Sequence, residues 1–223
     1  TVTGNTCYNN VFGIRLASSS DNTITGNTCN NNGSGIYLSP SSNNTITGNT
    51  CNNNGNGIYL STSNGSTVTG NTCNHNSLYC IYLYSSDNNT VTGNTCNHSR
   101  YGIVLTSYSE DNTVTGNTCH NNLCGISLST ASNNTVTGNT CNHNGNYGIS
   151  LSSSHNNTIT GNTCKHNSVC GISLSSSHNN TITGNTCIRG TGTPGDYTTN
   201  QYTIQLQGTA NNYNLISLNN CMG

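Results

Sequence analysis

Hydrophobic side chains recur along this chain at a fixed interval, in two short blocks of constant phase. The first block reads T-[IV]-T-G-N-T-C and occurs nine times, with 22 or 23 residues between successive cysteines. The second block, I-x-L, places an isoleucine seven or eight residues after each of the first eight cysteines. A repeat of this length is typical of solenoid proteins, whose coils bury a hydrophobic core only when they stack on one another.

Alternation inside these blocks predicts three short strands in each coil. In T-[IV]-T the aliphatic residue points inward and the threonines point outward, because successive side chains of a strand alternate between its faces. A Gly-Asn corner leads into the strand that carries the cysteine, and I-x-L forms the third strand. Neighbouring coils then lie ~4.8 Å apart in parallel register. We therefore predict an all-β protein, a three-sided parallel β-helix of about ten coils.

Stacking of similar coils places equivalent residues in columns along the core. The inward cysteine column consists of Cys7, Cys29, Cys51, Cys73, Cys96, Cys119, Cys141, Cys164 and Cys187. The inward asparagine ladder consists of Asn5, Asn27, Asn49, Asn71, Asn94, Asn117, Asn139, Asn162 and Asn185. We expect each amide to bond its neighbour and the corner backbone, so that losing one leaves buried polar groups unpaired at ~1–3 kcal/mol.

The end of the chain departs from the repeat. Residues 1–187 read as regular coils, and residues 188–223 read as a divergent final coil with an irregular loop. This loop is the one non-repeating element. We therefore expect Gly190, Pro194 and Asp196 to lie at a junction between subunits and to set the register there.

The repeat resembles that of a known family. The pattern N-N-T-I-T-G-N-T-x-x-N-N-x-x-G-I-x-L-S-x-S is similar to the repeat of NosD-like proteins of the carbohydrate-binding and sugar-hydrolase superfamily, found in tandem in surface proteins of methanogenic archaea. The resemblance implies a right-handed parallel β-helix, and it is strong over residues 1–187 and weak beyond them. That family usually has an aliphatic residue where this chain has its cysteine column.

Charge and cysteine content narrow the setting in which the chain works. Four basic and five acidic residues give a net charge of −1, so nothing indicates a nucleic-acid partner. No apolar run approaches the ~20 residues of a membrane helix, so we expect no membrane insertion. Because the chain opens inside a repeat, we expect a mature or excised segment. Thirteen cysteines favour an oxidising, extracellular or cell-surface location, with buried reduced thiols as the alternative.

Three further cysteines stand outside the column, at Cys80, Cys124 and Cys170. They belong to alternate coils, so they are ~10 Å apart and too distant to pair with one another. Each follows the column cysteine of its own coil by five to seven residues, across one corner. We therefore predict three same-coil disulfides: Cys73–Cys80, Cys119–Cys124 and Cys164–Cys170.

Candidate catalytic groups are sparse, so we expect the chain not to be an enzyme and to need no cofactor. Acid–base chemistry on a glycosidic bond uses a pair of carboxyl groups at a defined separation. The carboxylates here are Asp21, Asp87, Glu110, Asp111 and Asp196. Asp21, Asp87 and Asp111 occupy the return corner of their coils, the polar stretch between I-x-L and the next T-[IV]-T block. Aspartate is favoured there simply because it suits turns.

Histidines near the cysteines are the candidate metal ligands. Two sets repeat: His75, His98, His143 and His166 two residues after a column cysteine, and His155 and His178 in the return corner. Asn31 and Asn53 occupy the first of these positions in other coils. We interpret it as a corner that takes asparagine or histidine interchangeably, and we predict no metal site.

The polar surface suggests two further partners. The threonines of T-[IV]-T form two outward files, a T-x-T array that resembles the ice-binding face of β-solenoid antifreeze proteins, although threonine also suits any exposed strand. The files contain Thr23/Thr25, Thr45/Thr47, Thr67/Thr69, Thr90/Thr92, Thr113/Thr115, Thr135/Thr137, Thr158/Thr160 and Thr181/Thr183. Asn-x-Ser/Thr triplets at Asn43, Asn88, Asn133, Asn156 and Asn179 offer sites for surface glycans if a glycosylating cell secretes the chain.

These observations favour an extracellular structural protein, a self-assembling subunit of a fibre, sheath or surface coat. Its partner would be a second copy of itself, in head-to-tail or lateral contact, because exposed strand edges with few charges invite pairing. The alternative is a β-solenoid that binds ice or carbohydrate.

Overall fold

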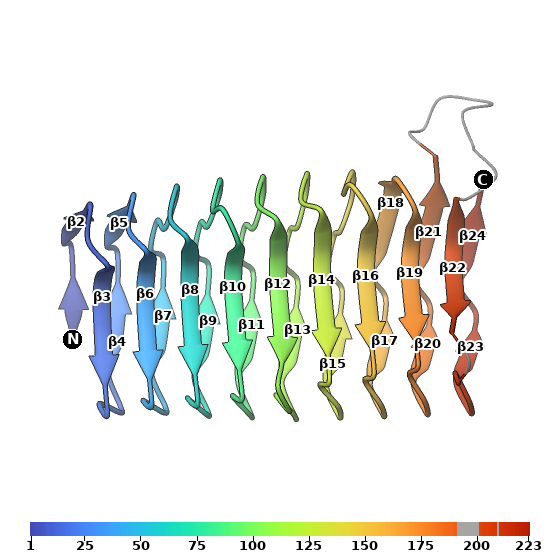
Figure 1. Ribbon diagram of the computed structural model, residues 1–223, viewed down its shortest axis with the longest axis horizontal. Coiled ribbons are helices and arrows are strands. Elements are labelled where there is room, and N and C mark those ends of the chain that lie inside the picture. The colour runs from blue at the N-terminus through green and yellow to red at the C-terminus, as the bar shows by residue number, and fades with distance from the viewer. Residues whose placement is uncertain (191–200, 209) are drawn as a thin grey trace.

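The computed structural model describes residues 1–190, 201–208 and 210–223, and this part of the chain consists of strands and turns. The strands wind into a rod, with the N-terminal coil at one end and the last coil at the other (Figure 1). The predicted fold, a right-handed parallel β-helix, is confirmed. In the described ranges, no helix is long and apolar enough to cross a membrane.

Two long parallel sheets form two sides of the rod. The ten-stranded sheet contains β1 (Val2–Thr3), β4 (Thr23–Thr25), β7 (Thr45–Thr47), β9 (Thr67–Thr69), β11 (Thr90–Thr92), β13 (Thr113–Thr115), β15 (Thr135–Thr137), β17 (Thr158–Thr160), β20 (Thr181–Thr183) and β23 (Leu215–Ser217). The nine-stranded sheet contains β3 (Phe12–Ala17), β6 (Ser34–Ser39), β8 (Asn56–Ser61), β10 (Tyr79–Tyr84), β12 (Tyr101–Thr106), β14 (Cys124–Ser129), β16 (Tyr147–Ser152), β19 (Cys170–Ser175) and β22 (Tyr202–Gln207). The number of complete turns is therefore slightly below the predicted ten.

The third side, which carries the cysteines, is less regular than predicted. It forms strands only near the two ends of the rod: β2 (Thr6–Tyr8) and β5 (Thr28–Asn30), then β18 (Thr163–Asn167), β21 (Thr186–Arg189) and β24 (Asn220–Met222). Between them, successive coils are joined by isolated parallel bridges through the threonine before each cysteine, such as Thr50 to Thr72. The Gly-Asn corner and the variable corner, which is the polar stretch between the cysteine and the I-x-L strand, lie so close together that little strand remains between them.

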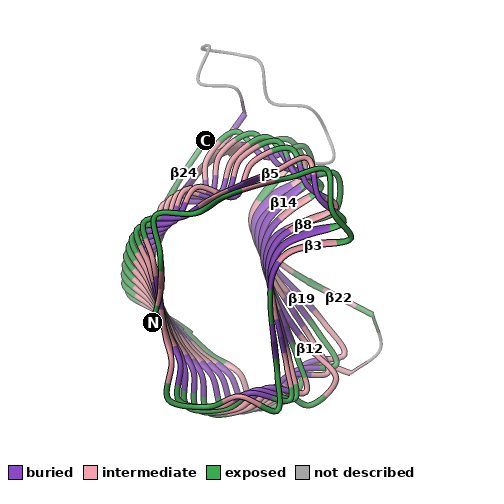
Figure 2. Cartoon of the chain, turned by 90° about the vertical axis from the view of Figure 1, so that its left-hand side faces the viewer, coloured by how far each residue is buried: buried purple, intermediate pink, exposed green. Residues whose placement is uncertain are grey.

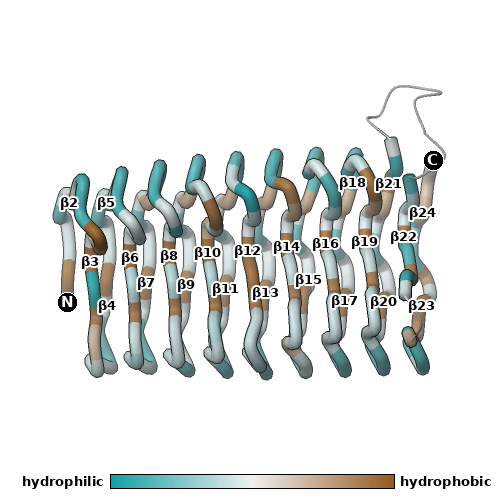
Figure 3. The backbone as a smooth tube through the Cα atoms, in the orientation of Figure 1, coloured by the Kyte–Doolittle hydropathy of each residue, from teal (hydrophilic) through white to brown (hydrophobic). Residues whose placement is uncertain are grey.

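The core consists of the inward columns that the alternation predicts. Equivalent residues pair in register, as Ile36 with Ile58, so each inward side chain packs on its counterpart in the next coil. Ile36, Leu38 and Cys51 have no exposed surface. Buried residues recur at the same places in successive coils along most of the rod (Figure 2), whereas the last coil, residues 201–208 and 210–223, contains none. Hydrophobic residues recur as narrow bands from one coil to the next (Figure 3). Stacking therefore supplies the burial that one coil lacks.

Polar columns seal the corners of this core. Asn27 donates its backbone N–H and its Nδ2 to Asn49 Oδ1, both at 2.9 Å, and its Nδ2 also reaches the carbonyl oxygen of Thr25. The asparagine ladder expected from the sequence is thus present. Two more inward polar columns, rich in asparagine, run through the other corners, with bonds of 2.8 Å from the amides of Asn32 and Asn89 to the next coil. Each ladder satisfies buried backbone donors that the turns leave unpaired.

Candidate functional site

Aromatic side chains gather on the outward face of the nine-stranded sheet. The outward residue of I-x-L is a tyrosine in β6, β8 and β10, and in-register pairing places Tyr37 beside Tyr59 and Tyr59 beside Tyr82. Their ring centroids are 4.9 and 4.7 Å apart. Phe12 of β3 adds a ring 4.8 Å from Tyr37. We call these four rings the aromatic column.

Further tyrosines flank the end of the aromatic column. Tyr79 begins β10, and its ring lies 4.4 Å from that of Tyr82. Tyr101 begins the neighbouring strand β12, with its ring 5.7 Å from that of Tyr79. The guanidinium carbon of Arg100 lies 5.7 Å from the Tyr101 ring centroid, within the range of a cation–π contact. These contacts hold the tyrosines as one packed group.

A groove begins where the aromatic column ends. The residues that follow Tyr82 in the same register position are Val104, Ser127 and Ser150, which are much smaller. This step in side-chain size leaves a hollow of about 270 Å³, and an adjoining hollow of about 110 Å³. Together they form the tyrosine groove, lined by Tyr79, Tyr82, Tyr101, Val104, Thr106, Leu123, Cys124, Ser127, Ser129, Asn146, Tyr147, Ser150 and Ser152.

The tyrosine groove offers hydroxyl groups and aromatic rings, and its lining includes no carboxylate. Burial raises the pKa of Tyr82 to about 12, and Tyr59, Tyr79 and Tyr84 add to this shift. Burial also raises the pKa of Tyr59. At neutral pH these phenols therefore stay protonated, so each can donate one hydrogen bond and accept others.

The sequence contains a signal for this groove in the outward residue of I-x-L, which our predictions did not include. That residue is tyrosine in three consecutive coils, at Tyr37, Tyr59 and Tyr82, and serine in later ones such as Ser127 and Ser150. An outward position is ordinarily solvent-exposed, so a change in side-chain size there does not disturb the core pattern. Only the parallel register of the strands shows that the change from tyrosine to smaller residues forms a step in the surface.

The cysteine column is present, but the predicted same-coil disulfides are not. All thirteen cysteines are free thiols, so the bridges Cys73–Cys80, Cys119–Cys124 and Cys164–Cys170 are absent. Cys124 lies between Tyr101 and Tyr147 in the register of the nine-stranded sheet, and Cys170 lies beyond Tyr147. Both thiols donate to a carbonyl oxygen two residues along their own strand, at 3.4 and 2.9 Å. Cys124 and Cys170 therefore share the register position of Tyr79, Tyr101 and Tyr147, which we call the groove file, and do not belong to the cysteine column.

Equivalent histidines of neighbouring coils pair on the corners of the rod. Ring centroids of equivalent histidines are 4.7 to 5.1 Å apart in the pairs His75–His98, His143–His166 and His155–His178. The histidines of the first two pairs have φ of 55° or 56°, and Asn31 and Asn53, in the same position of other coils, have φ of 56° and 57°. Asparagine and histidine are both enriched in this left-handed region, which explains their interchange. Among the described residues, no group of three or more His, Cys, Asp or Glu is arranged to hold a metal ion.

Most acidic residues lie on the return corners, and none of them lines the tyrosine groove. Asp87 and Glu110 are neighbours there, and the backbone N–H of Glu110 donates to Asp87 Oδ1 at 2.9 Å. Asp21 and Asp111 adopt the left-handed conformation, with φ of 60° and 55°. These carboxylates therefore serve the turns, as aspartate commonly does.

The other surface predictions fall on different parts of the rod. The two threonine files lie on the ten-stranded sheet, where Thr23 pairs with Thr45 and Thr25 with Thr47. The five candidate glycan asparagines are exposed on the return corners. Gly190 is buried, with its carbonyl oxygen 3.1 Å from His166 Nδ1. Pro194 and Asp196 lie outside the described residues. Ice binding, glycosylation and assembly through the loop stay predictions.

Comparison with known proteins identifies one family and several solved structures that share this fold. The sequence profile described as "Periplasmic copper-binding protein (NosD)" matches residues 1–123 and 107–222. Comparison with curated protein sequences finds no match. The mannuronan C-5 epimerase AlgE4 A-module of Azotobacter vinelandii has a TM-score of 0.80 at 16% identity, covering 100% of this chain and 75% of that one. A bacteriophage tailspike enzymatically active domain has a TM-score of 0.75 at 14% identity, with coverages of 99% and 38%.

The periplasmic alginate epimerase AlgG is a further neighbour. Its TM-score is 0.67 at 18% identity, and the match covers 92% of this chain and 59% of AlgG, so the chain spans about three fifths of that protein. Identities this low show a shared fold. The neighbours nevertheless contradict our expectation that the chain is not an enzyme, because they are epimerases and an enzymatically active domain. Sparse carboxylates were a poor criterion on a fold that carries such enzymes.

Proposed function

Because the chain belongs to the NosD family, described as periplasmic copper-binding proteins, we propose that it works outside the cytoplasm, and that it binds a carbohydrate chain in the tyrosine groove. The groove is the candidate binding surface on which aromatic rings and many hydroxyl groups meet. The observation that carries the proposal is the step after Tyr82, where the aromatic column gives way to a serine-lined hollow.

The chemistry of the groove suits a sugar. A pyranose ring has apolar C–H faces and a rim of hydroxyl groups. Tyrosines give an apolar surface with a polar end, as in many binding sites. The beginning of the hollow is walled by Tyr82 and Tyr101, and Ser127, Ser129 and Ser152 supply hydroxyls that donate and accept. The main hollow is near the lower limit of ligand pockets, about 300 Å³. A shallow, open groove of this size fits a few units of an extended chain.

The structural neighbours support the same class of ligand. The two epimerases are named for mannuronan and alginate, and both share this fold over most of the chain. The threonine files have the regularity that ice binding would need, but the aromatic column and the two hollows found among the described residues lie elsewhere, on the nine-stranded sheet. Self-association into a fibre likewise stays a prediction. We therefore place carbohydrate binding ahead of both.

Copper, which the family description names, does not fit the described residues. A copper site in a protein needs several converging nitrogen or sulfur ligands, with thiolates for copper(I). The described residues contain no group of three such ligands. Apart from Cys7, the column thiols have no exposed surface, so a metal ion from solution does not reach them. At Cys96, burial also raises the pKa and opposes the thiolate that a metal requires. We assign no copper-dependent role to this chain.

Affinity electrophoresis tests the proposal. The chain is run through gels containing alginate, a neutral β-glucan, chitosan or no polysaccharide. We expect retardation by at least one of them. Tyr82→Ala and Tyr101→Ala should weaken it by at least tenfold, since aromatic anchors at the centre of a site are often worth more than ~1.4 kcal/mol.

The matched control is Tyr108→Asn, which removes an exposed tyrosine (71%) from a corner with φ of 62°, a conformation that asparagine tolerates. It should bind like the unaltered chain. Retardation lost equally in all three variants, or absent with every polysaccharide, would contradict the proposal. Reducing ends and uronate composition measured after incubation report whether bound chains are also processed.

A further inference from the structure

Cys80 is the exception in a column that is otherwise almost entirely glycine. The residue before the isoleucine of I-x-L is glycine at Gly13, Gly35, Gly57, Gly102, Gly125, Gly148 and Gly171. A Cβ added at any of these seven would lie 3.0 or 3.1 Å from the Cβ of the column cysteine in the following coil. At Gly57 that cysteine is Cys73, and at Gly102 it is Cys119. The column therefore places the Cβ of Cys80 against Cys96.

The neighbouring residue is adapted to this exception. Five of those glycines also face an asparagine of the following coil, whose Nδ2 would lie 2.8 to 3.1 Å from an added Cβ. Opposite Cys80 this residue is Ser99 instead, since Asn76 N–H donates to Ser99 Oγ and Ser99 N–H donates to Asn122 Oδ1 along the same ladder. Cys80 Sγ lies 3.0 Å from Ser99 Oγ. The smaller serine leaves room for the additional thiol.

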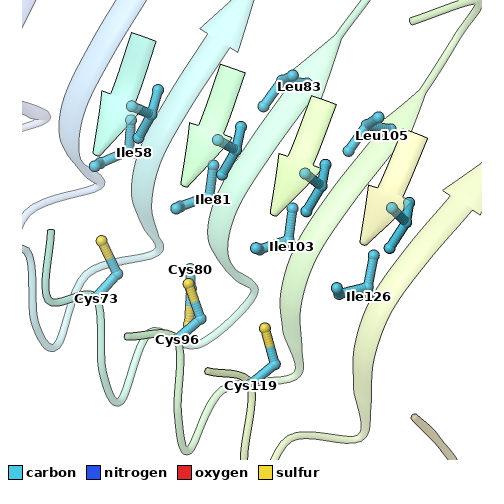
Figure 4. Packing of buried hydrophobic residues seen from close by; sticks show 14 of the residues in the cluster. Ile58, Cys73, Cys80, Ile81, Leu83, Cys96, Ile103, Leu105, Cys119 and Ile126 are labelled. Atoms are coloured by element: carbon cyan, nitrogen blue, oxygen red, sulfur yellow. The ribbon is translucent and has the colours of Figure 1, made fainter. Parts of the chain in front are cut away.

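The two cysteines lie side by side in the core. Figure 4 shows Cys80 and Cys96 adjacent, with Cys73 and Cys119 one coil away on either side. Both have no exposed surface. Disulfides need Cβ atoms ~3.5–4.5 Å apart. Consecutive column cysteines are a strand spacing of ~4.8 Å apart with parallel Cβ vectors, slightly too far for an unstrained bond. An added Cβ at Gly57 would also meet the Cys80 carbonyl oxygen at 2.5 Å. A Cβ that starts 3.0 or 3.1 Å from the column cysteine must give by a few tenths of an ångström, so the Cβ separation at Cys80 moves toward the disulfide range.

We propose that Cys80 and Cys96 form a disulfide that joins consecutive coils when the chain folds under oxidising conditions. The two thiols lose two protons and two electrons to a disulfide oxidant, which becomes two thiols, and one S–S bond forms. Because both side chains end fully buried, the exchange takes place while β12 docks against β10. The bond would tie the strand of Tyr79 and Tyr82 to the coil that leads into Tyr101, and so fix two walls of the tyrosine groove. The proposal stands independently of what the groove binds.

Refolding with and without a defined oxidant tests this proposal. The reduced, unfolded chain is refolded in a mixture of oxidised and reduced glutathione, or in dithiothreitol alone. Free thiols are alkylated after denaturation, and the chain is digested with chymotrypsin, which can cut between the two cysteines at Tyr82 to Tyr84. We expect one cross-linked peptide pair, containing Cys80 and Cys96, only in the glutathione sample.

Two variants keep the test decisive. Cys80→Gly restores the residue of the other coils, so it should fold and lose the cross-link. Cys124→Ser removes a thiol from the groove file and should retain the cross-link. Cys80 recovered as a free, alkylated thiol from the glutathione sample, or bonded to Cys73 as the sequence suggested, would overturn the proposal.

Discussion

Removing one amide from the asparagine ladder should weaken the whole rod measurably. Asn117 Oδ1 accepts the backbone N–H of Asn94 at 2.9 Å and its Nδ2 at 3.0 Å. Asn117 Nδ2 in turn donates to the carbonyl oxygens of Val91 and Thr115, at 2.9 and 3.1 Å, and to Asn139 Oδ1 at 3.0 Å. Asn117→Ala leaves the buried N–H of Asn94 without its acceptor and removes the bonds that Nδ2 donates.

The expected loss follows from these partners. An orphaned buried donor costs about 1–3 kcal/mol, and each remaining lost bond about 1 kcal/mol, partly offset where the carbonyls keep other donors. We therefore expect the free energy of unfolding to fall by about 2–4 kcal/mol. Urea unfolding followed by far-ultraviolet circular dichroism measures it, provided that the dependence on urea concentration keeps its slope.

A matched surface variant gives the reference for this measurement. Ser168 is exposed on the variable corner, and Ser168→Ala should change stability by less than about 0.5 kcal/mol. An Asn117→Ala chain as stable as Ser168→Ala would show that the ladder contributes nothing beyond filling space. The expected cost of an unpaired buried amide would then be wrong for this fold.

Three other substitutions have outcomes that the structure determines. Gly102→Ala should destabilise the chain by about 1–3 kcal/mol, because its Cβ would meet the Gly125 carbonyl oxygen at 2.4 Å, whereas Gly116→Asn, with φ of 63° and open space, should have little effect in the same urea assay. His143 has its pKa lowered by burial and then by His166, so the folded state binds its proton less readily than the unfolded state. The contribution of neutral His143 to stability is complete above the unfolded pKa of about 6.5 and is lost as pH falls through the lower folded pKa. His143→Asn should therefore flatten the decline of the free energy of unfolding below pH 6.5. An unchanged pH profile would contradict this.

The fold could be predicted because the repeat determines it at every level. One aliphatic residue between two threonines defines which face is inward, and a constant period places equivalent residues such as Ile36 and Ile58 on one another. The Asn27 ladder followed from the same stacking. The strand that carries the cysteines was overestimated because two corners close upon it, a matter of backbone geometry that residue types alone do not reveal.

The site was harder to predict because it depends on the offset between coils. Sequence spacing paired Cys80 with Cys73, five to seven residues being a plausible span for one corner. In the structure, the residue before the isoleucine of I-x-L instead lies against the column cysteine of the next coil, so Cys80 lies against Cys96. In the same way, Tyr82 and Tyr101 belong to different repeats, and only their packing across two strands shows a shared groove.

A structure of the complex with the polysaccharide fragment that binds most tightly would test the central proposal most directly. We predict sugar rings in the tyrosine groove, against Tyr82 and Tyr101, with hydroxyl groups bonded to Ser127 and Ser129. Sugar bound instead on the threonine files of the ten-stranded sheet, or at the ends of the rod with the groove empty, would contradict it.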